Sequence, residues 1–208
     1  MHAGLRVWAM AGLALLCCGS IPVPAPNLYD SEDLVPMNPR AQEAIQFRRK
    51  PILGSWWAEM PSIRVCASSG VSEARMDRAM RYWRRLGYSI PHVWYDDGSA
   101  ICQGDGIIGE IMISIVRSDV PFGINLAITR FHHSTRTREL IKSQIYVYPA
   151  MVDKELLIEH ELGHALGWIH YNRGLHVMNE NYNHIGHDSI GLTWREYIAE
   201  RKRSQDRN

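Results

Sequence analysis

Residues 160–170 read H-E-L-G-H-A-L-G-W-I-H, and this stretch decides what kind of domain the chain can form. On a helix, the four-residue step from His160 to His164 puts two imidazoles on one face, one turn apart, where both can bind one metal ion. Gly167 follows where the helix should end, because a residue without Cβ tolerates the left-handed cap conformation, and the chain can then turn to bring His170 to the same point. Three histidines around zinc leave a fourth position open for water.

Glu161 lies about 100° around the helix from His160, so its carboxylate is expected beside the metal and not on it. There it can take a proton from zinc-bound water and pass it to a departing amine. Neutral imidazoles leave zinc with its positive charge, which lowers the pKa of bound water from about 16 to about 7. The motif therefore predicts a hydrolase that cleaves an amide bond, in a peptide or in another molecule, by Glu161-assisted attack of zinc-bound water.

The long form of this motif, with Gly167 and His170 after the first two histidines, resembles that of the metzincin zinc metallopeptidases. Met178, in L-H-V-M, resembles the methionine turn that those enzymes have below the metal. The short connection from His170 to this methionine is most similar to the matrixin-like branch. The similar stretch runs from about Gln144 to Met178.

This resemblance implies a zinc endopeptidase that cleaves proteins or peptides. By the same resemblance, His160, His164 and His170 would bind Zn²⁺, Glu161 would be the general base, and Met178 would form a hydrophobic floor without binding the metal.

The resemblance also implies an α+β fold, a zincin-like domain with a mixed twisted sheet. That sheet would have an antiparallel edge strand, and a methionine turn would separate the active-site helix from a C-terminal helix. We assign the edge strand to Gly123–Ile128, where a peptide substrate could add as a further strand through main-chain hydrogen bonds.

Several features of this chain depart from the pattern of the family. Some metzincin branches place a tyrosine zinc ligand two residues after the turn methionine, where this chain has Glu180. Tyr182 is near enough to be considered as a hydrogen-bond donor to the reaction intermediate, but a surface or core tyrosine is favoured. A matrixin-like P-R-C-G cysteine switch is absent, which puts latency by a pro-segment thiolate in doubt.

The composition is that of an ordinary globular protein. The chain has 208 residues, 46% of them hydrophobic and 22% charged, which fits one domain with a core. The net charge of +1 argues against nucleic acid or an anionic membrane as the main partner. We therefore expect a monomer whose partner is a protein or peptide substrate.

The N-terminal region is predicted to be a targeting segment and a linker. Residues 1–20 resemble a secretory signal peptide, with Arg6 before an apolar run that is too short to span a bilayer. Cys17 and Cys18 weakly suggest a bacterial lipid anchor, and an uncleaved apolar start is the alternative. Residues 21–50 are a proline-rich leader or linker, and residues 51–208 the metzincin-like peptidase domain. The localisation predicted is secreted or extracytoplasmic.

Without the signal peptide, the chain keeps Cys66 and Cys102, an even count in a compartment where disulfides persist. A disulfide between them is favoured. Two buried free thiols remain the alternative, because bridging depends on the distance between the Cα atoms.

Periodicity and capping residues place the secondary structure. Ser72 is expected to cap a helix that Gly87 ends, and Asp153 to cap the helix of the metal motif. A capping box of Thr193 and Glu196 predicts the last helix. Strands are predicted at Ile63–Cys66, Pro91–Trp94, Gly109–Val116, Leu126–Arg130 and Gln144–Tyr148. The apolar face of the first helix should be buried, and it consists of Met76, Ala79, Met80, Trp83 and Leu86. The arginines of the same helix lie largely outside this face and should be solvated: Arg75, Arg78, Arg81, Arg84 and Arg85.

Two further sets of polar residues could bind metals. One could offer oxygen ligands to calcium but matches no calcium loop, so a plain turn is favoured: Asp96, Asp97 and Asp105. The other could assist a structural zinc or line a cleft, but each member is interpreted as an isolated surface histidine: His132, His133, His176, His184 and His187.

A second hypothesis comes from a different class of function. In it, the chain is a secreted, non-catalytic binding or structural protein that keeps zinc only to hold its fold, and the fourth metal position is closed. The presence of Glu161 favours the enzyme.

Overall fold

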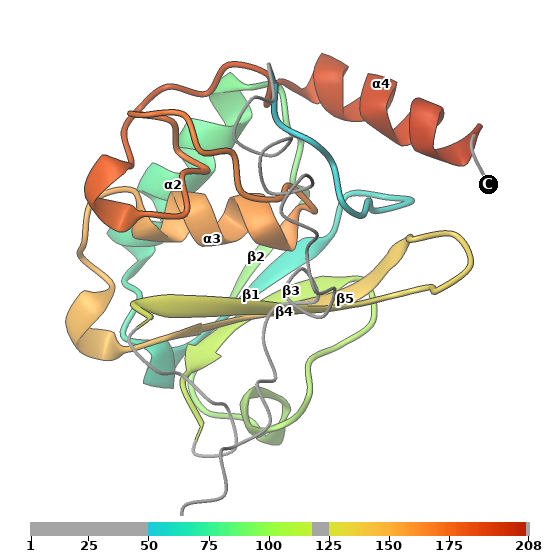
Figure 1. Cartoon of the computed structure of the whole chain (residues 1–208). Helices are drawn as coiled ribbons and strands as arrows, with labels where there is room; N and C mark the ends of the chain where they lie inside the picture. The colour runs from blue at the N-terminus through green and yellow to red at the C-terminus, as the bar shows by residue number, and fades with distance from the viewer. Residues whose placement is uncertain (1–49, 118–124, 207–208) are drawn as a thin grey trace, which may run out of the picture.

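A computed structural model describes residues 50–117 and 125–206. The predicted signal peptide, Cys17 and Cys18, and all of the predicted leader except Lys50 lie outside these residues. The described chain forms a mixed α+β structure of a five-stranded sheet and three α-helices (Figure 1). The strands are β1 (Ser62–Cys66), β2 (Val93–Asp96), β3 (Glu110–Ile115), β4 (Ala127–His133) and β5 (Leu140–Val147). The helices are α2 (Glu73–Arg85), α3 (Leu157–Ala165) and α4 (Trp194–Gln205).

The sheet is mixed, with strand order β2-β1-β3-β5-β4. Its first four strands pair in parallel, and β4 pairs antiparallel to β5 at one edge. The predicted antiparallel edge strand is therefore confirmed, but it covers Ala127–His133 and not Gly123–Ile128. Gly123 lies outside the described residues. Residues 134–139 join β4 to β5, and the two strands stay paired up to His133 and Leu140, so both extend further toward this loop than the apolar pattern predicted.

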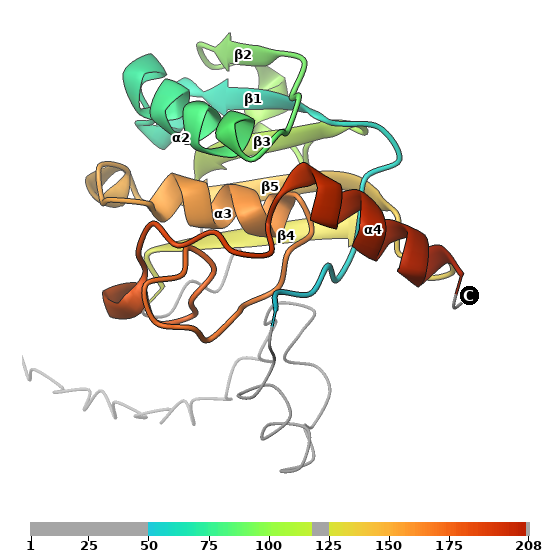
Figure 2. The ribbon, with the colours of Figure 1, turned by 90° about the horizontal axis from the view of Figure 1, so that it is seen from above.

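Helices α2 and α3 lie side by side across one face of the sheet, with α3 over β4 and β5 (Figures 1 and 2). Alternate residues of the strands point toward these helices and are buried, as expected for a sheet with one face on a core. The buried strand residues include Ile63, Val65, Ile111, Ile113, Ile145 and Val147. The helix that carries the metal motif thus packs on the buried face of the sheet.

Helix α2 begins and ends as predicted, with one exception on its surface. The Ser72 hydroxyl accepts a hydrogen bond from the main-chain nitrogen of Arg75, and the chain leaves the helix at Leu86 and Gly87. The predicted apolar face packs into the core. The prediction that Arg75 is solvated was wrong, because its guanidinium is buried in an ion pair with Glu159 of α3.

Helix α4 begins at the predicted capping box, in which the Glu196 carboxylate and the Thr193 hydroxyl each accept a main-chain N–H. The buried Tyr197 hydroxyl accepts a hydrogen bond of 2.8 Å from the main-chain nitrogen of Trp57. Its ring also packs against that of Trp168, just after α3. Helix α4 therefore fixes the segment before β1 against the end of α3. None of the helices within the described ranges has the length and apolar character needed to cross a bilayer.

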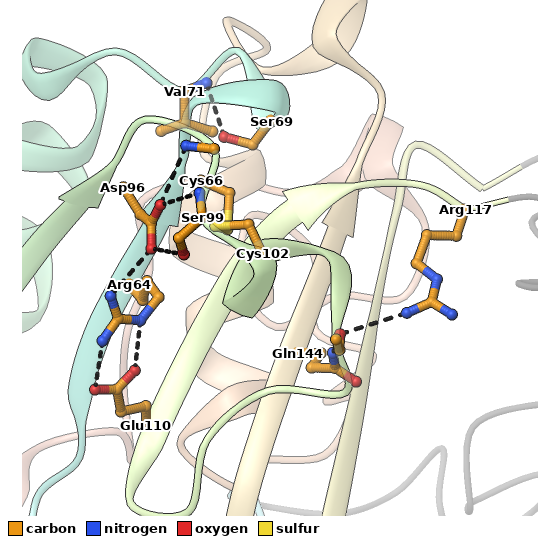
Figure 3. The surroundings of a disulfide bond; sticks show 12 residues. Arg64, Cys66, Ser69, Val71, Asp96, Ser99, Cys102, Glu110, Arg117 and Gln144 are labelled. Atoms are coloured by element: carbon orange, nitrogen blue, oxygen red, sulfur yellow. Dashed lines mark hydrogen bonds and ion pairs between the residues drawn. A yellow bond between two sulfur atoms is a disulfide. The ribbon is translucent and has the colours of Figure 1, made fainter.

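The predicted disulfide between Cys66 and Cys102 is present, with a Cα–Cα distance of 5.7 Å (Figure 3). It ties the end of β1 to the loop after β2. Beside it, the Asp96 carboxylate accepts hydrogen bonds from Gly98, from Ser99 and from the guanidinium of Arg64 (Figure 3). These bonds lower the pKa of Asp96 to about 2. Asp96 thus holds a plain turn, the structure that was favoured for it over a calcium site, and Asp105 instead pairs with Arg117.

Candidate metal centre

Helix α3 carries three of the four motif residues, and its start differs from the prediction. Asp153 does not cap it. The residue before the first helical turn is Leu156, which has φ of 60° and gives no side-chain cap. The segment before α3 is folded into turns, and two of its carbonyls, those of Val152 and Lys154, accept hydrogen bonds from the Arg75 guanidinium. These turns delay the helix past Asp153. The Leu157 nitrogen at the start of the helix donates to the Lys154 carbonyl, and the Arg75 guanidinium donates to carbonyls of the turns.

The end of α3 follows the prediction at Gly167, whose φ is 104°. The Gly167 nitrogen donates to the His164 carbonyl, and the Trp168 nitrogen donates to the Gly163 carbonyl. This pair of bonds is the Schellman motif that reverses a chain after a helix. A Cβ at Gly167 would overlap the main-chain oxygen of Ser55, so the position requires glycine for space as well as for conformation. The reversal returns His170 toward the helix.

The three motif histidines meet at one point. The Nε2 atom of His164 lies 3.0 Å from that of His160 and 3.0 Å from that of His170. The opposite ring nitrogens of the two helical histidines face main-chain carbonyls. His160 Nδ1 lies 2.7 Å from the Val177 oxygen, and His164 Nδ1 lies 2.8 Å from the Trp168 oxygen. Because a carbonyl only accepts, the hydrogen sits on Nδ1 and the lone pair on Nε2 points at the shared centre.

Burial keeps these imidazoles neutral. Burial is the main reason that the pKa is lowered to about 3 for His160, about 4 for His164 and about 2 for His170, and the neighbouring histidines contribute to the low values of His160 and His170. Neutral rings offer lone pairs, but lone pairs this close repel one another unless a cation lies between them. The donor set therefore fits a metal ion held by three imidazoles. In the described part of the chain, no other group of histidine, cysteine or carboxylate ligands has this arrangement.

Met178 packs against helix α3 at Gly163. A Cβ on Gly163 would overlap the Met178 thioether, so the side chain packs directly on the α3 backbone between the two helical histidines. The methionine turn is held by His176, whose Nδ1 accepts a hydrogen bond of 3.1 Å from the Met178 nitrogen. His176 is fully buried, so its interpretation as a surface histidine was wrong. The turn also supplies the Val177 carbonyl that orients His160.

Glu161 is buried next to the first ligand, with 5% of its surface exposed. Its Oε2 accepts a hydrogen bond of 2.6 Å from the Thr129 hydroxyl of β4. Sequence reasoning did not single out Thr129. Alternation along the strand indicates only that this side chain faces the core, and no local pattern connects it to a helix residue 32 positions away.

The other residues considered from the sequence lie away from the histidine cluster or have structural partners. The Tyr182 hydroxyl donates to the Glu155 carbonyl at 2.7 Å, which agrees with the structural role that was favoured for it. Glu180, His132, His184 and His187 are exposed, and His133 is half-buried. A cavity of about 330 Å³ opens before the first turn of α3, lined by Glu155, Leu156, Tyr182, Asn183, Ile185, Gly186 and His187.

Comparisons with known proteins do not assign the chain to a family. Neither the models of known protein families nor the curated proteins contain a match to this chain.

Proposed function

We propose that this chain is a zinc-dependent endopeptidase of the metzincin type, most similar to the matrixin-like branch. The observation that carries the proposal is the convergence of three imidazole Nε2 atoms within 4.8 Å of one another, with the Glu161 carboxylate on the same helix. The antiparallel edge strand, the ligand-bearing helix, the methionine below it and the C-terminal helix support a zincin-like domain.

We propose Zn²⁺ as the metal, held by His160, His164 and His170. Three neutral nitrogen ligands with one position left for water are the donor set of catalytic zinc sites. When bound, zinc supplies a Lewis acid that makes water a stronger nucleophile at neutral pH and polarises the scissile carbonyl.

In this proposal, Glu161 moves the proton. Its carboxylate is one residue from His160 and is buried, so it can accept a proton from water at the metal centre with little competition from solvent. The same carboxyl group then donates that proton to the amine that leaves. The Lewis acid and the carboxylate together suffice for cleavage of a peptide bond.

The substrate that we propose is an extended protein or peptide segment. Among the described residues, strand β4 pairs with β5 alone, and its other side is an edge to which a peptide can add through main-chain hydrogen bonds. The cavity before α3 starts one turn from the first ligand, since the His160 nitrogen donates to the Leu156 carbonyl. It is a candidate for receiving a substrate side chain. The disulfide supports a secreted or extracytoplasmic location.

The test is hydrolysis of a quenched-fluorescence unfolded protein by the zinc-loaded chain and by Glu161→Gln. Loss of the carboxylate should lower kcat by at least about 100-fold, the lower end of what general acid–base catalysis contributes, while one zinc per chain stays bound. The matched control is Glu180→Gln, which makes the same chemical change at an exposed glutamate after Met178 and should keep the parent rate.

Equal rates for the parent and Glu161→Gln would refute the proposed mechanism. Stoichiometric zinc without turnover in the parent would instead favour the non-catalytic, zinc-stabilised binding protein.

A further inference from the structure

The hydrogen bond between Thr129 and Glu161 joins the edge strand to the motif helix. At 2.6 Å it has the length of an O–H···O bond to a charged carboxylate. Both partners are buried, with 2% of Thr129 and 5% of Glu161 exposed. The Thr129 hydroxyl also lies 3.2 Å from the main-chain oxygen of Glu161, so its oxygen sits directly against this residue. Because the hydroxyl has one hydrogen, the shorter contact with the carboxylate determines where it points.

Thr129 is itself held in place by the sheet. It lies opposite Ile145 in the antiparallel pairing of β4 with β5, away from the irregularity near His133. Its β-branched side chain has few χ1 rotamers, so a paired backbone also fixes the hydroxyl. Glutamate, by contrast, has three side-chain torsions and loses rotamer entropy when it is fixed. A rigid donor on a strand is therefore well suited to hold a flexible carboxylate.

We propose that Thr129 is a positioning residue that holds the Glu161 carboxylate in the orientation needed for proton transfer. This inference rests on the proposed peptidase function and adds a residue that the motif does not contain. Thr129 acts through Glu161 and not on the metal or the substrate. Its loss should therefore lower kcat, because a base that samples several rotamers is less often in its productive geometry, and should leave KM and zinc binding almost unchanged.

Two matched pairs of variants separate the hydroxyl from the packing of the side chain. Thr129→Val keeps the shape of the parent and removes only the hydrogen-bond donor. Thr129→Ser and Thr129→Ala both lose the γ-methyl group, and only the serine keeps the hydroxyl. If Thr129→Val does not fold, the comparison of serine with alanine still isolates the hydrogen bond.

The measurement is kcat and KM of each full-length, zinc-loaded variant on the unfolded-protein substrate, together with zinc affinity and melting temperature. Thr129→Val should lower kcat by about 10- to 100-fold relative to the parent, as for other partners that orient active-site groups. Thr129→Ala should lower kcat by about the same factor relative to Thr129→Ser. KM and the zinc dissociation constant should change by less than about threefold, far below the loss expected for a metal ligand. Thr129→Ser should recover most of the parent kcat.

A control separates loss of stability from loss of positioning. Ser143→Ala on β5 removes another buried hydroxyl, one that donates to the Arg130 carbonyl. It should lower the melting temperature and leave kcat unchanged.

The inference is overturned if Thr129→Val keeps the parent kcat, or if serine and alanine lose the same amount. It also fails if the zinc-loaded parent shows no hydrolysis, but then the proposed function fails with it. An active parent with an unaffected Thr129→Val contradicts the positioning role alone.

Discussion

At the scale of single residues, the histidine cluster is organised by main-chain carbonyls. The Val177 and Trp168 oxygens each fix the Nδ1–H tautomer of a helical histidine, so the Nε2 lone pair of each ring points at the centre of the cluster. The rings are buried and neutral, so their lone pairs are available to a cation, whereas protonation of a ring would put a charge in the protein interior. The metal-free protein should therefore be sensitive to acid.

We predict that the free energy of unfolding of the metal-free chain falls as the pH drops below about 6.5, the ordinary pKa of histidine. The folded pKa values of His160, His164 and His170 are about 3, 4 and 2, so between these values and 6.5 the unfolded chain binds protons that the folded chain does not. Each histidine contributes a slope of up to about 1.4 kcal/mol per pH unit. Stability from this source is complete above pH 6.5 and is lost on acidification.

Urea unfolding of the metal-free chain at pH 7.5, 6.5 and 5.5 checks this prediction. His164→Asn is the control, since it removes one of the three groups and should reduce the slope below pH 6.5. A free energy of unfolding that is the same at pH 7.5 and 5.5 would contradict it.

The clustering of the three candidate ligands was predictable from the sequence because their geometry is local. Two histidines share a helical turn, and one glycine reverses the chain toward the third. Thr129 was not predictable, because its role depends on which strand lies beside α3 and on the register of that strand. The burial of His176 could not be predicted from the sequence either, because its hydrogen-bond partners are main-chain atoms of a loop.

At the scale of elements, α3 is held against α2 by a buried ion pair. The Arg75 guanidinium makes two hydrogen bonds with the Glu159 carboxylate, at 2.9 and 2.6 Å, and also reaches two carbonyls of the segment before α3. The Trp83 indole of α2 donates to the main-chain oxygen of Glu159. Helix α2 is therefore joined both to α3 and to the segment that precedes it.

We predict that Arg75→Met lowers the free energy of unfolding by about 3–5 kcal/mol, because it leaves the Glu159 carboxylate buried without its partner. Arg78→Met makes the same change at an exposed position of the same helix and should cost less than about 0.5 kcal/mol. Chemical denaturation of the two variants provides the measurement. Similar losses in both would show that the ion pair does not hold α3.

The amphipathic pattern placed α2 and its apolar face correctly, because that pattern reflects burial along one helix. It could not identify Arg75 as buried. An arginine at the border of the apolar face is solvated or paired according to what packs there, and the carboxylate comes from an element 84 residues away. The start of α3 was misplaced because turns before the helix, and not a capping side chain, supply the partners of its first residues.

At the scale of the whole molecule, a sheet and the helices on one of its faces bring distant parts of the chain to one site. Strand β4 contributes Thr129, α3 contributes two histidines and Glu161, and the segment after α3 contributes His170 and Met178. The strand positions could be predicted approximately from apolar runs, whereas the strand order could not, since parallel strands are joined by crossovers whose lengths do not determine which strands become neighbours. The mixed sheet and its antiparallel edge were expected only from the resemblance to metzincins.

The most direct measurement of the central claim is a zinc titration of the metal-free parent chain, with hydrolysis of an unfolded protein followed at each step. We predict that the rate rises in proportion to added zinc, reaches a plateau at one equivalent per chain and falls to background when a chelator removes the metal. A chain that binds one equivalent of zinc tightly and shows no turnover at any point of the titration would contradict the proposed function.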